Sequence, residues 1–204
     1  MKLFLSLLLV GIASGSNAQM NSIDMTDEKE IAILANGCFW CTEAIFQQLQ
    51  GVDSVEPGYI GGTKDNPTYE EVCTGNTFHA EALRIVFDPK IITYEQLLEV
   101  YFATHDPTTL NRQGNDIGTQ YRSEIFFTNS KQKELAENFI RWMTDEKIFD
   151  NPIVTKISPA TIFWVAEDYH HNYYKTHPDK TYCAMVIHPK VEKFKKYFQD
   201  RLKK

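Results

Sequence analysis

The chain has 204 residues, of which 43% are apolar, and a formal net charge of −6. This length and apolar content predict one folded domain with a substantial core. The acidic balance argues against a nucleic-acid-binding protein, because phosphate groups require a basic face.

The first stretch, MKLFLSLLLVGIASGSNAQM, has the pattern of a secretory signal peptide. A basic Lys2 precedes an apolar run that is too short to span a bilayer, and a small-x-small pattern ends at Ala18. We expect cleavage after Ala18, export to the periplasm or the medium, and no stable membrane insertion. Residues 1–18 would then be the signal, 19–28 a flexible polar segment and 29–204 the folded domain. Removing Lys2 with the signal leaves 20 basic and 27 acidic residues, a formal charge of −7.

Hydrophobic periodicity and turn residues predict the secondary structure in chain order. The expected strands cover 30–37, 52–63, 79–89, 123–128, 153–157 and 161–166. The expected helices cover 42–49, the stretch after a Thr93 N-cap, 130–144, 166–174 and the stretch from Pro189. Two segments, 64–77 and 105–123, are rich in turn residues and predict loops. No repeat or linker divides the chain, so we expect a single α+β domain whose mixed or antiparallel sheet is covered by helices.

Two cysteines, Cys38 and Cys41, lie in the sequence ANGCFWCTEAIFQQL, where a strand gives way to a helix. Their spacing alone fits a structural disulfide, half of a metal site, a thiol-disulfide exchange pair or a nucleophile with a partner. A thiol at a strand-to-helix turn lies near the positive end of the helix dipole, which stabilises a thiolate. The preceding Gly37 allows the tight turn that such a site needs.

The carboxyl group of Glu81 lies on the apolar face of the predicted strand HAEALRIVFDP, in which side chains alternate between the two faces. Burial there would raise its pKa and let it donate a proton near neutral pH. The alternative is that Glu81 ends the strand in water or pairs with Arg84 or Arg122.

Aromatic and polar residues elsewhere could complete a site around Cys38. Phe39 and Trp40 are of a type most often found in cores, but beside a nucleophile they can wall a small apolar pocket. Tyr69, Asp116 and Tyr121 lie in predicted loops and can form hydrogen bonds to a polar oxygen of a substrate.

Five motifs, taken in order, resemble those of the type A methionine sulfoxide reductases. They are GCFWC, NPTYEEVC, HAEALRIVFDP, HDPTTLNRQGNDIGTQYRS and AEDYHHNYY, and the resemblance covers roughly residues 30–198. The chain departs from the commonest form of the family by having Cys41 and Phe78 where glycine is frequent.

The resemblance implies a ferredoxin-like two-layer plait. It also implies a thiol-dependent reduction of the S epimer of methionine sulfoxide in proteins, and the free amino acid is a further candidate substrate. It implies that Cys38 is the nucleophile and Glu81 the proton donor. It also implies that Phe39 and Trp40 line the pocket for the methyl group. Tyr69, Asp116 and Tyr121 would orient the sulfoxide oxygen.

Attack by Cys38 would leave a sulfenic acid, which a second thiol must convert to a disulfide. Cys41 is the first choice because residues three apart share a helix face. The resemblance adds Cys183, because a C-terminal cysteine often has this role in the family, and a relay through both stays open. Cys73 is expected to be a packed thiol.

No metal or organic cofactor is needed, so the electrons must come from a thioredoxin-like dithiol partner. For an exported chain, this partner must act in the cell envelope. We expect the protein to be a monomer.

Three other interpretations compete with this one. A thiol-disulfide exchange enzyme would explain Cys38 and Cys41 but would give Glu81 no role. A metal-binding module would use the same cysteines with histidines among His170, His171 and His177. A purely structural Cys38–Cys41 disulfide would make both thiols dispensable for activity.

Overall fold

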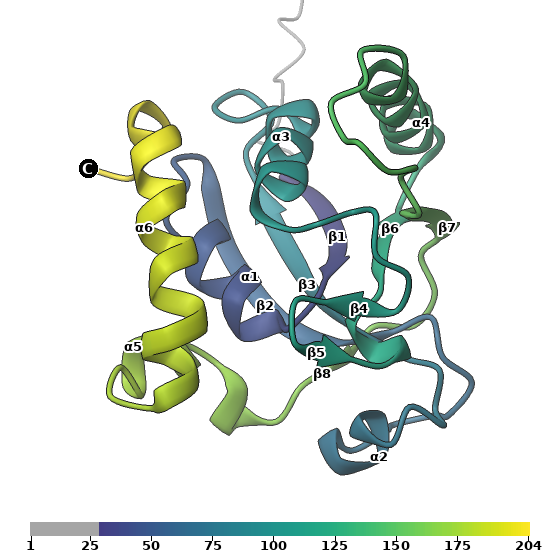
Figure 1. Cartoon of the computed structure of the whole chain (residues 1–204), viewed down its shortest axis with the longest axis vertical. Helices are drawn as coiled ribbons and strands as arrows, with labels where there is room; N and C mark the ends of the chain where they lie inside the picture. Colours follow the sequence, from purple (N-terminus) through teal and green to yellow (C-terminus); the bar gives the residue numbers. More distant parts are fainter. Residues whose placement is uncertain (1–28) are drawn as a thin grey trace, which may run out of the picture.

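The computed structural model describes residues 29–204, so the predictions for residues 1–18 and 19–28 lie outside the described residues. A six-stranded sheet with the order β7-β6-β1-β3-β2-β8 forms the centre of the domain (Figure 1). Its strands are β1 Glu30–Asn36, β2 Val52–Ile60, β3 Ala80–Phe87, β6 Ser123–Phe127, β7 Lys156–Pro159 and β8 Trp164–Val165. Neighbouring strands are antiparallel except β6 and β7, which are parallel. A separate small hairpin pairs β4 Arg112–Gln113 with β5 Asp116–Ile117.

The larger of the cores lies between one face of this sheet and the helices. The helices are α1 Phe39–Phe46, α2 Tyr69–Cys73, α3 Tyr94–Thr104, α4 Ser130–Asp145, α5 Tyr173–Thr176 and α6 His188–Tyr197. Figure 1 shows α1 and α6 side by side over the sheet, with α3 and α4 farther along it. The opposite face has a smaller core, against which Ala160 and Phe163 pack. The predicted single α+β domain with a mixed sheet and helices is therefore confirmed.

Helix α1 begins three residues earlier than its periodicity predicted. Gly37 has a φ of +97°, which turns the chain sharply at the end of β1. Cys38 is consequently the N-cap residue, and its carbonyl accepts from the amides of Cys41 at 3.1 Å and Thr42 at 3.4 Å. Phe39 and Trp40 therefore belong to the first turn of the helix, and the two cysteines lie one turn apart.

One predicted loop and one predicted helix were wrong, because capping or tertiary contacts decide the local structure of these segments. The predicted loop 64–77 contains α2, which begins with a capping box between Thr68 and Glu71. The predicted helix 166–174 breaks into a 3-10 turn and the short α5, because Asn172 is left-handed with a φ of +54°.

Smaller differences concern element ends. Strands β7 and β8 begin three residues after the predicted starts, and the 105–123 segment contains the β4–β5 hairpin. The N-cap predicted at Thr93 is present, and Gln96 completes a capping box with it. On α4, Met143 is buried whereas Trp142 is 53% exposed. None of the helices in residues 29–204 is long and apolar enough to cross a membrane.

The turn before Cys38 can be tested with two glycine variants. A Cβ at Gly37 would lie 2.7 Å from side-chain carbons of Gln113, whereas a Cβ at Gly114 would meet nothing within 4 Å. Both residues have positive φ, so both alanine variants carry strain of about 1 kcal/mol, and only Gly37→Ala adds an overlap costing roughly 1–3 kcal/mol. We expect urea denaturation to give a clearly lower midpoint for Gly37→Ala than for Gly114→Ala. Equal midpoints would show that Gln113 moves aside.

Candidate active site

The carboxyl group of Glu81 lies against the start of α1, next to Cys38. Glu81 is 1% exposed, and its Oε2 accepts a hydrogen bond from the Phe39 amide at 3.0 Å. This amide belongs to the first turn of a helix, where N–H groups have no partner within the helix. Burial raises the pKa of Glu81 to about 8, although the Phe39 amide opposes the shift. Arg84 and Arg122 pair instead with other carboxylates, so Glu81 is a neutral acid near pH 7.

The thiol of Cys38 is buried, with 8% of the residue exposed. Burial raises its pKa well above the usual value, and the contact with Cys41 and the charge of Glu81 raise it further. The expectation that the helix dipole holds Cys38 as a thiolate is therefore wrong for the free protein. The main physical reason is burial of the sulfur, and the first amide of α1 donates to Glu81 and not to this thiol.

Cys41 has a different environment, although it is also buried. A hydrogen bond with Cys38 lowers the pKa of the Cys41 thiol, and the positive charge of Lys190 acts in the same direction. The Cys41 sulfur also lies 4.0 Å from the hydroxyl of Tyr182, which donates to Asp116 Oδ2 at 2.7 Å. Sequence reasoning missed Tyr182, although it directly precedes Cys183.

An aromatic cluster surrounds the first turn of α1. The rings of Trp40 and Tyr173 stack with their centroids 3.8 Å apart and 7° between their planes. The Trp40 indole N–H donates to His170 Nδ1 at 3.0 Å, and burial lowers the pKa of His170 to about 4, so this histidine is neutral. Phe39 stacks on Tyr69 with centroids 6.5 Å apart. The cluster forms an apolar wall of the kind predicted from Phe39 and Trp40 alone. His170 and Tyr173, which belong to the motif AEDYHHNYY, were not predicted to be part of this wall.

The predicted hydroxyl groups lie around the same acid. Burial raises the pKa values of Tyr69 and Tyr121, and the charge of Glu81 raises both further. Both phenols are therefore protonated at neutral pH and can donate hydrogen bonds. Cys38 and Asp116 also act electrostatically on Tyr121. The structure thus brings Cys38 and Glu81 together with all five of the other residues predicted to surround them.

Two further carboxylates hold the wall of the site in place. Glu167 accepts from the Tyr69 amide and the Tyr59 hydroxyl, each at 2.8 Å. Glu43, on α1, accepts from the Asn172 amide at 2.8 Å and so stabilises the left-handed residue just before Tyr173. These bonds fix Tyr69 and Tyr173 relative to Trp40.

The four cysteines all lie in the described part of the chain, and all are free thiols. Cys183 is fully buried in a π-helical turn, Cys183–Ile187, and burial and the charge of Cys41 raise its pKa. Cys73 is exposed, so its prediction as a packed thiol was wrong.

Within residues 29–204, no group of three or more histidine, cysteine or acidic side chains is arranged to hold a metal ion. Of the histidines considered as ligands, His170 accepts from Trp40, and His177 stacks on Tyr173 with centroids 4.4 Å apart.

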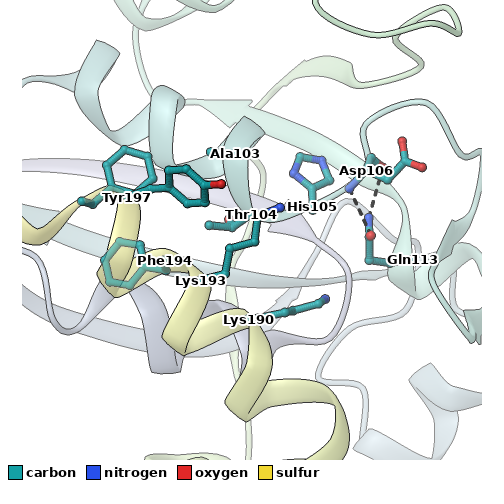
Figure 2. Close-up of a pocket in the computed structure, with 10 residues that line it drawn as sticks. Ala103, Thr104, His105, Asp106, Gln113, Lys190, Lys193, Phe194 and Tyr197 are labelled. Atoms are coloured by element: carbon teal, nitrogen blue, oxygen red, sulfur yellow. Dashed lines mark hydrogen bonds between the residues drawn. The ribbon is translucent and has the colours of Figure 1, made fainter.

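Two cavities lie beside α6, and the hairpin β4–β5 contributes to the lining of both. The first, of about 310 Å³, lies at the end of α3, where Figure 2 shows Lys190 extending from α6 toward Gln113, which is hydrogen-bonded to Asp106. The second, of about 440 Å³, shares Gln113 and Lys190 with the first and reaches Asp116 and Tyr182. Solvent therefore has a route to the side of the site where Tyr182 lies.

Comparison with known proteins shows the family of the chain. The family model described as peptide methionine sulfoxide reductase matches residues 30–202. The peptide methionine sulfoxide reductase MsrA of Deinococcus radiodurans is 56% identical over 175 residues, covering 86% of this chain and 85% of the relative.

Two solved structures are also similar. Reduced Mxr1 from Saccharomyces cerevisiae has a TM-score of 0.68 and 37% identity, covering 76% of this chain and 90% of that one. Methionine sulfoxide reductase A of Corynebacterium diphtheriae has a TM-score of 0.65 and 34% identity, covering 74% and 76%. The protein therefore belongs to the peptide methionine sulfoxide reductase family and is an oxidoreductase of its MsrA type.

Proposed function

We propose that this protein repairs oxidised methionine, using Cys38 as the nucleophile and Glu81 as the acid. Family membership makes it a thiol-dependent reductase of peptide methionine (S)-S-oxide. The observation that carries the assignment of roles is the buried, protonated Glu81, hydrogen-bonded to the amide of the residue next to Cys38. Free methionine sulfoxide is a second candidate substrate.

The chemistry follows from the positions of these groups. The Cys38 sulfur attacks the sulfoxide sulfur while Glu81 donates a proton to the sulfoxide oxygen, which is otherwise a poor leaving group. The proton of the Cys38 thiol returns to Glu81. The transient bond between the two sulfur atoms then breaks as the protonated oxygen moves from the substrate sulfur to the Cys38 sulfur, which releases methionine and leaves a sulfenic acid on Cys38.

The other residues of the site would bind the two ends of the sulfoxide group. Tyr69 and Tyr121, kept protonated by burial, would donate hydrogen bonds to the oxygen, with Asp116 helping to orient it. Phe39 and Trp40 would enclose the methyl group, because their rings lie in the aromatic cluster beside Cys38.

Recycling requires a second thiol and an external reductant. We favour Cys41 as the first resolving residue because it lies one turn from Cys38 in hydrogen-bonding contact. Cys183 could accept the disulfide afterwards, since it lies close enough for the charge of Cys41 to act on it. A thioredoxin-like dithiol would then return the enzyme to its reduced state, without a metal or organic cofactor. We expect a monomer to suffice, because one chain supplies every residue of the site.

The finer description of the fold is part of this proposal. The order β6-β1-β3-β2, with α1 and α3 in the two β-α-β connections, supports a ferredoxin-like two-layer plait. Strands β7 and β8 would be additions at its two edges.

A cysteine series tests the roles of the thiols. Without reductant, Cys38→Ser should release no methionine from a methionine sulfoxide peptide, because the nucleophile is absent. Cys41→Ser should release one equivalent and then stop cycling with thioredoxin. Cys73→Ser, the matched control, should behave as the native protein does. Normal cycling by Cys41→Ser would transfer the resolving role to Cys183.

The pH dependence of the single-turnover rate tests Glu81. Because Glu81 donates only when protonated and its pKa is about 8, its contribution is present below pH 8 and is lost as the pH rises above that value. Glu81→Gln should reduce the rate by roughly 10²–10⁴-fold and remove this alkaline loss. Glu56→Gln, on the neighbouring strand and paired with Arg84, is the control and should leave the profile unchanged. An alkaline loss that persists in Glu81→Gln would assign it to another group.

We also propose that the protein is exported and reduced in the cell envelope, on the basis of the pattern in residues 1–18. Residues 1–28 fused to a phosphatase that is active only after export should give enzyme activity in intact cells. A fusion carrying only residues 19–28 is the control and should give none. Equal activity from both fusions would contradict export by this segment.

A further inference from the structure

The hydroxyl of Tyr182 connects a thiol to a carboxylate. Its proton is donated to Asp116 Oδ2 at 2.7 Å. The Cys41 sulfur lies 4.0 Å from the same oxygen, and the contact with Tyr182 lowers the pKa of the Cys41 thiol, so this hydroxyl favours the Cys41 thiolate. The Cys41 sulfur, the Tyr182 hydroxyl and the Asp116 carboxylate therefore lie in a row, each in contact with the next.

The surroundings keep this chain in place. Tyr182 is half-buried, and its ring meets the edge of Trp40 with centroids 6.0 Å apart and planes at 74°. It directly precedes the π-helical turn Cys183–Ile187, a rare conformation that is frequent at functional sites. Burial raises the pKa of Tyr182, so the phenol stays protonated and can pass a proton on without holding a charge itself.

The reaction has a step that needs such a chain. For Cys41 to attack the sulfenic acid on Cys38, its thiol must lose a proton, and the departing hydroxide must gain one. Glu81 is hydrogen-bonded to the Phe39 amide and is the acid that we propose for the first half of the reaction. Lys190, in the cavity that also reaches Tyr182 and Asp116, favours negative charge on Cys41.

We propose that Tyr182 and Asp116 form a proton relay that activates Cys41 for the resolving step; this rests on the proposed function and on Cys41 as the first resolving thiol. The Cys41 proton passes to the Tyr182 oxygen while the Tyr182 proton passes to Asp116. The Cys41 sulfur bonds to the Cys38 sulfur, and the Cys38 S–O bond breaks. The hydroxide takes the proton from Asp116 and leaves as water. Cys41 is oxidised, the Cys38 sulfenic acid is reduced, and no outside reactant is consumed.

Tyr182→Phe tests the relay because it keeps the ring against Trp40 and removes only the hydroxyl. The reduced full-length protein is mixed with one equivalent of a methionine sulfoxide peptide, without reductant. Methionine release, sulfenic acid trapped with dimedone, and loss of free thiols are followed separately. We expect methionine release within about twofold of native and a sulfenic acid lifetime at least tenfold longer, a size typical of lost acid-base assistance. The pH dependence of disulfide formation should also move to higher pH.

The matched control is Tyr174→Phe, which removes a hydroxyl that bonds His188 and should change none of these rates. Asp116→Asn should also lengthen the sulfenic acid lifetime, and the double variant with Tyr182→Phe should be no slower than the slower single variant, because both changes interrupt one chain.

The relay is overturned if Tyr182→Phe leaves the sulfenic acid lifetime unchanged, or if it slows methionine release as much as disulfide formation. It is also overturned if Tyr182→Phe still lengthens the lifetime in a Cys41→Ser background, where the relay has no thiol to serve. Failure of the proposed function would look different, because the native protein would then release no methionine at all.

Discussion

The hydrogen bond from the Phe39 amide to Glu81 joins β3 to the first turn of α1, and the chemistry of the site depends on it. A carboxyl group this deeply buried needs a donor, and the start of a helix provides amides that have no partner within the helix. The bond fixes the acid next to Cys38. It also engages the amide that would otherwise lie free beside the sulfur, so the free protein has a neutral acid next to a protonated thiol.

This arrangement changes how the nucleophile is generated. A preformed thiolate would place its charge beside Glu81, and each negative charge would raise the pKa of the other group. With both groups protonated, the site binds an uncharged substrate without that repulsion. The proton leaving Cys38 and the proton reaching the sulfoxide oxygen must then move within one event, which requires Glu81 to face both atoms.

The sequence predicted those parts of the site that follow from local pattern. Alternation along β3 placed Glu81 on the buried face, and the strand-to-helix turn placed Cys38 near the start of a helix, although α1 begins three residues before the predicted start. Parts that depend on distant segments could not be predicted in this way. Tyr182 lies 141 residues from Cys41 along the chain, and the break at Asn172 is stabilised by the carboxylate of Glu43, on α1. Local preference favoured a continuous helix there, and the tertiary hydrogen bond overrode it.

Two carboxyl groups near the site, Glu167 and Glu81, differ in whether they can donate a proton at neutral pH. Burial would raise the pKa of Glu167, but hydrogen bonds from the Tyr69 amide and the Tyr59 hydroxyl lower it, and the group remains partly exposed. Glu81 has one donor and almost no exposure, and its pKa rises to about 8. The number of donors and the access of water thus decide which carboxyl group can give up a proton at neutral pH. Because Glu167 stays charged, it can hold Tyr69 firmly against the site throughout the reaction, while Glu81 changes its protonation state beside it.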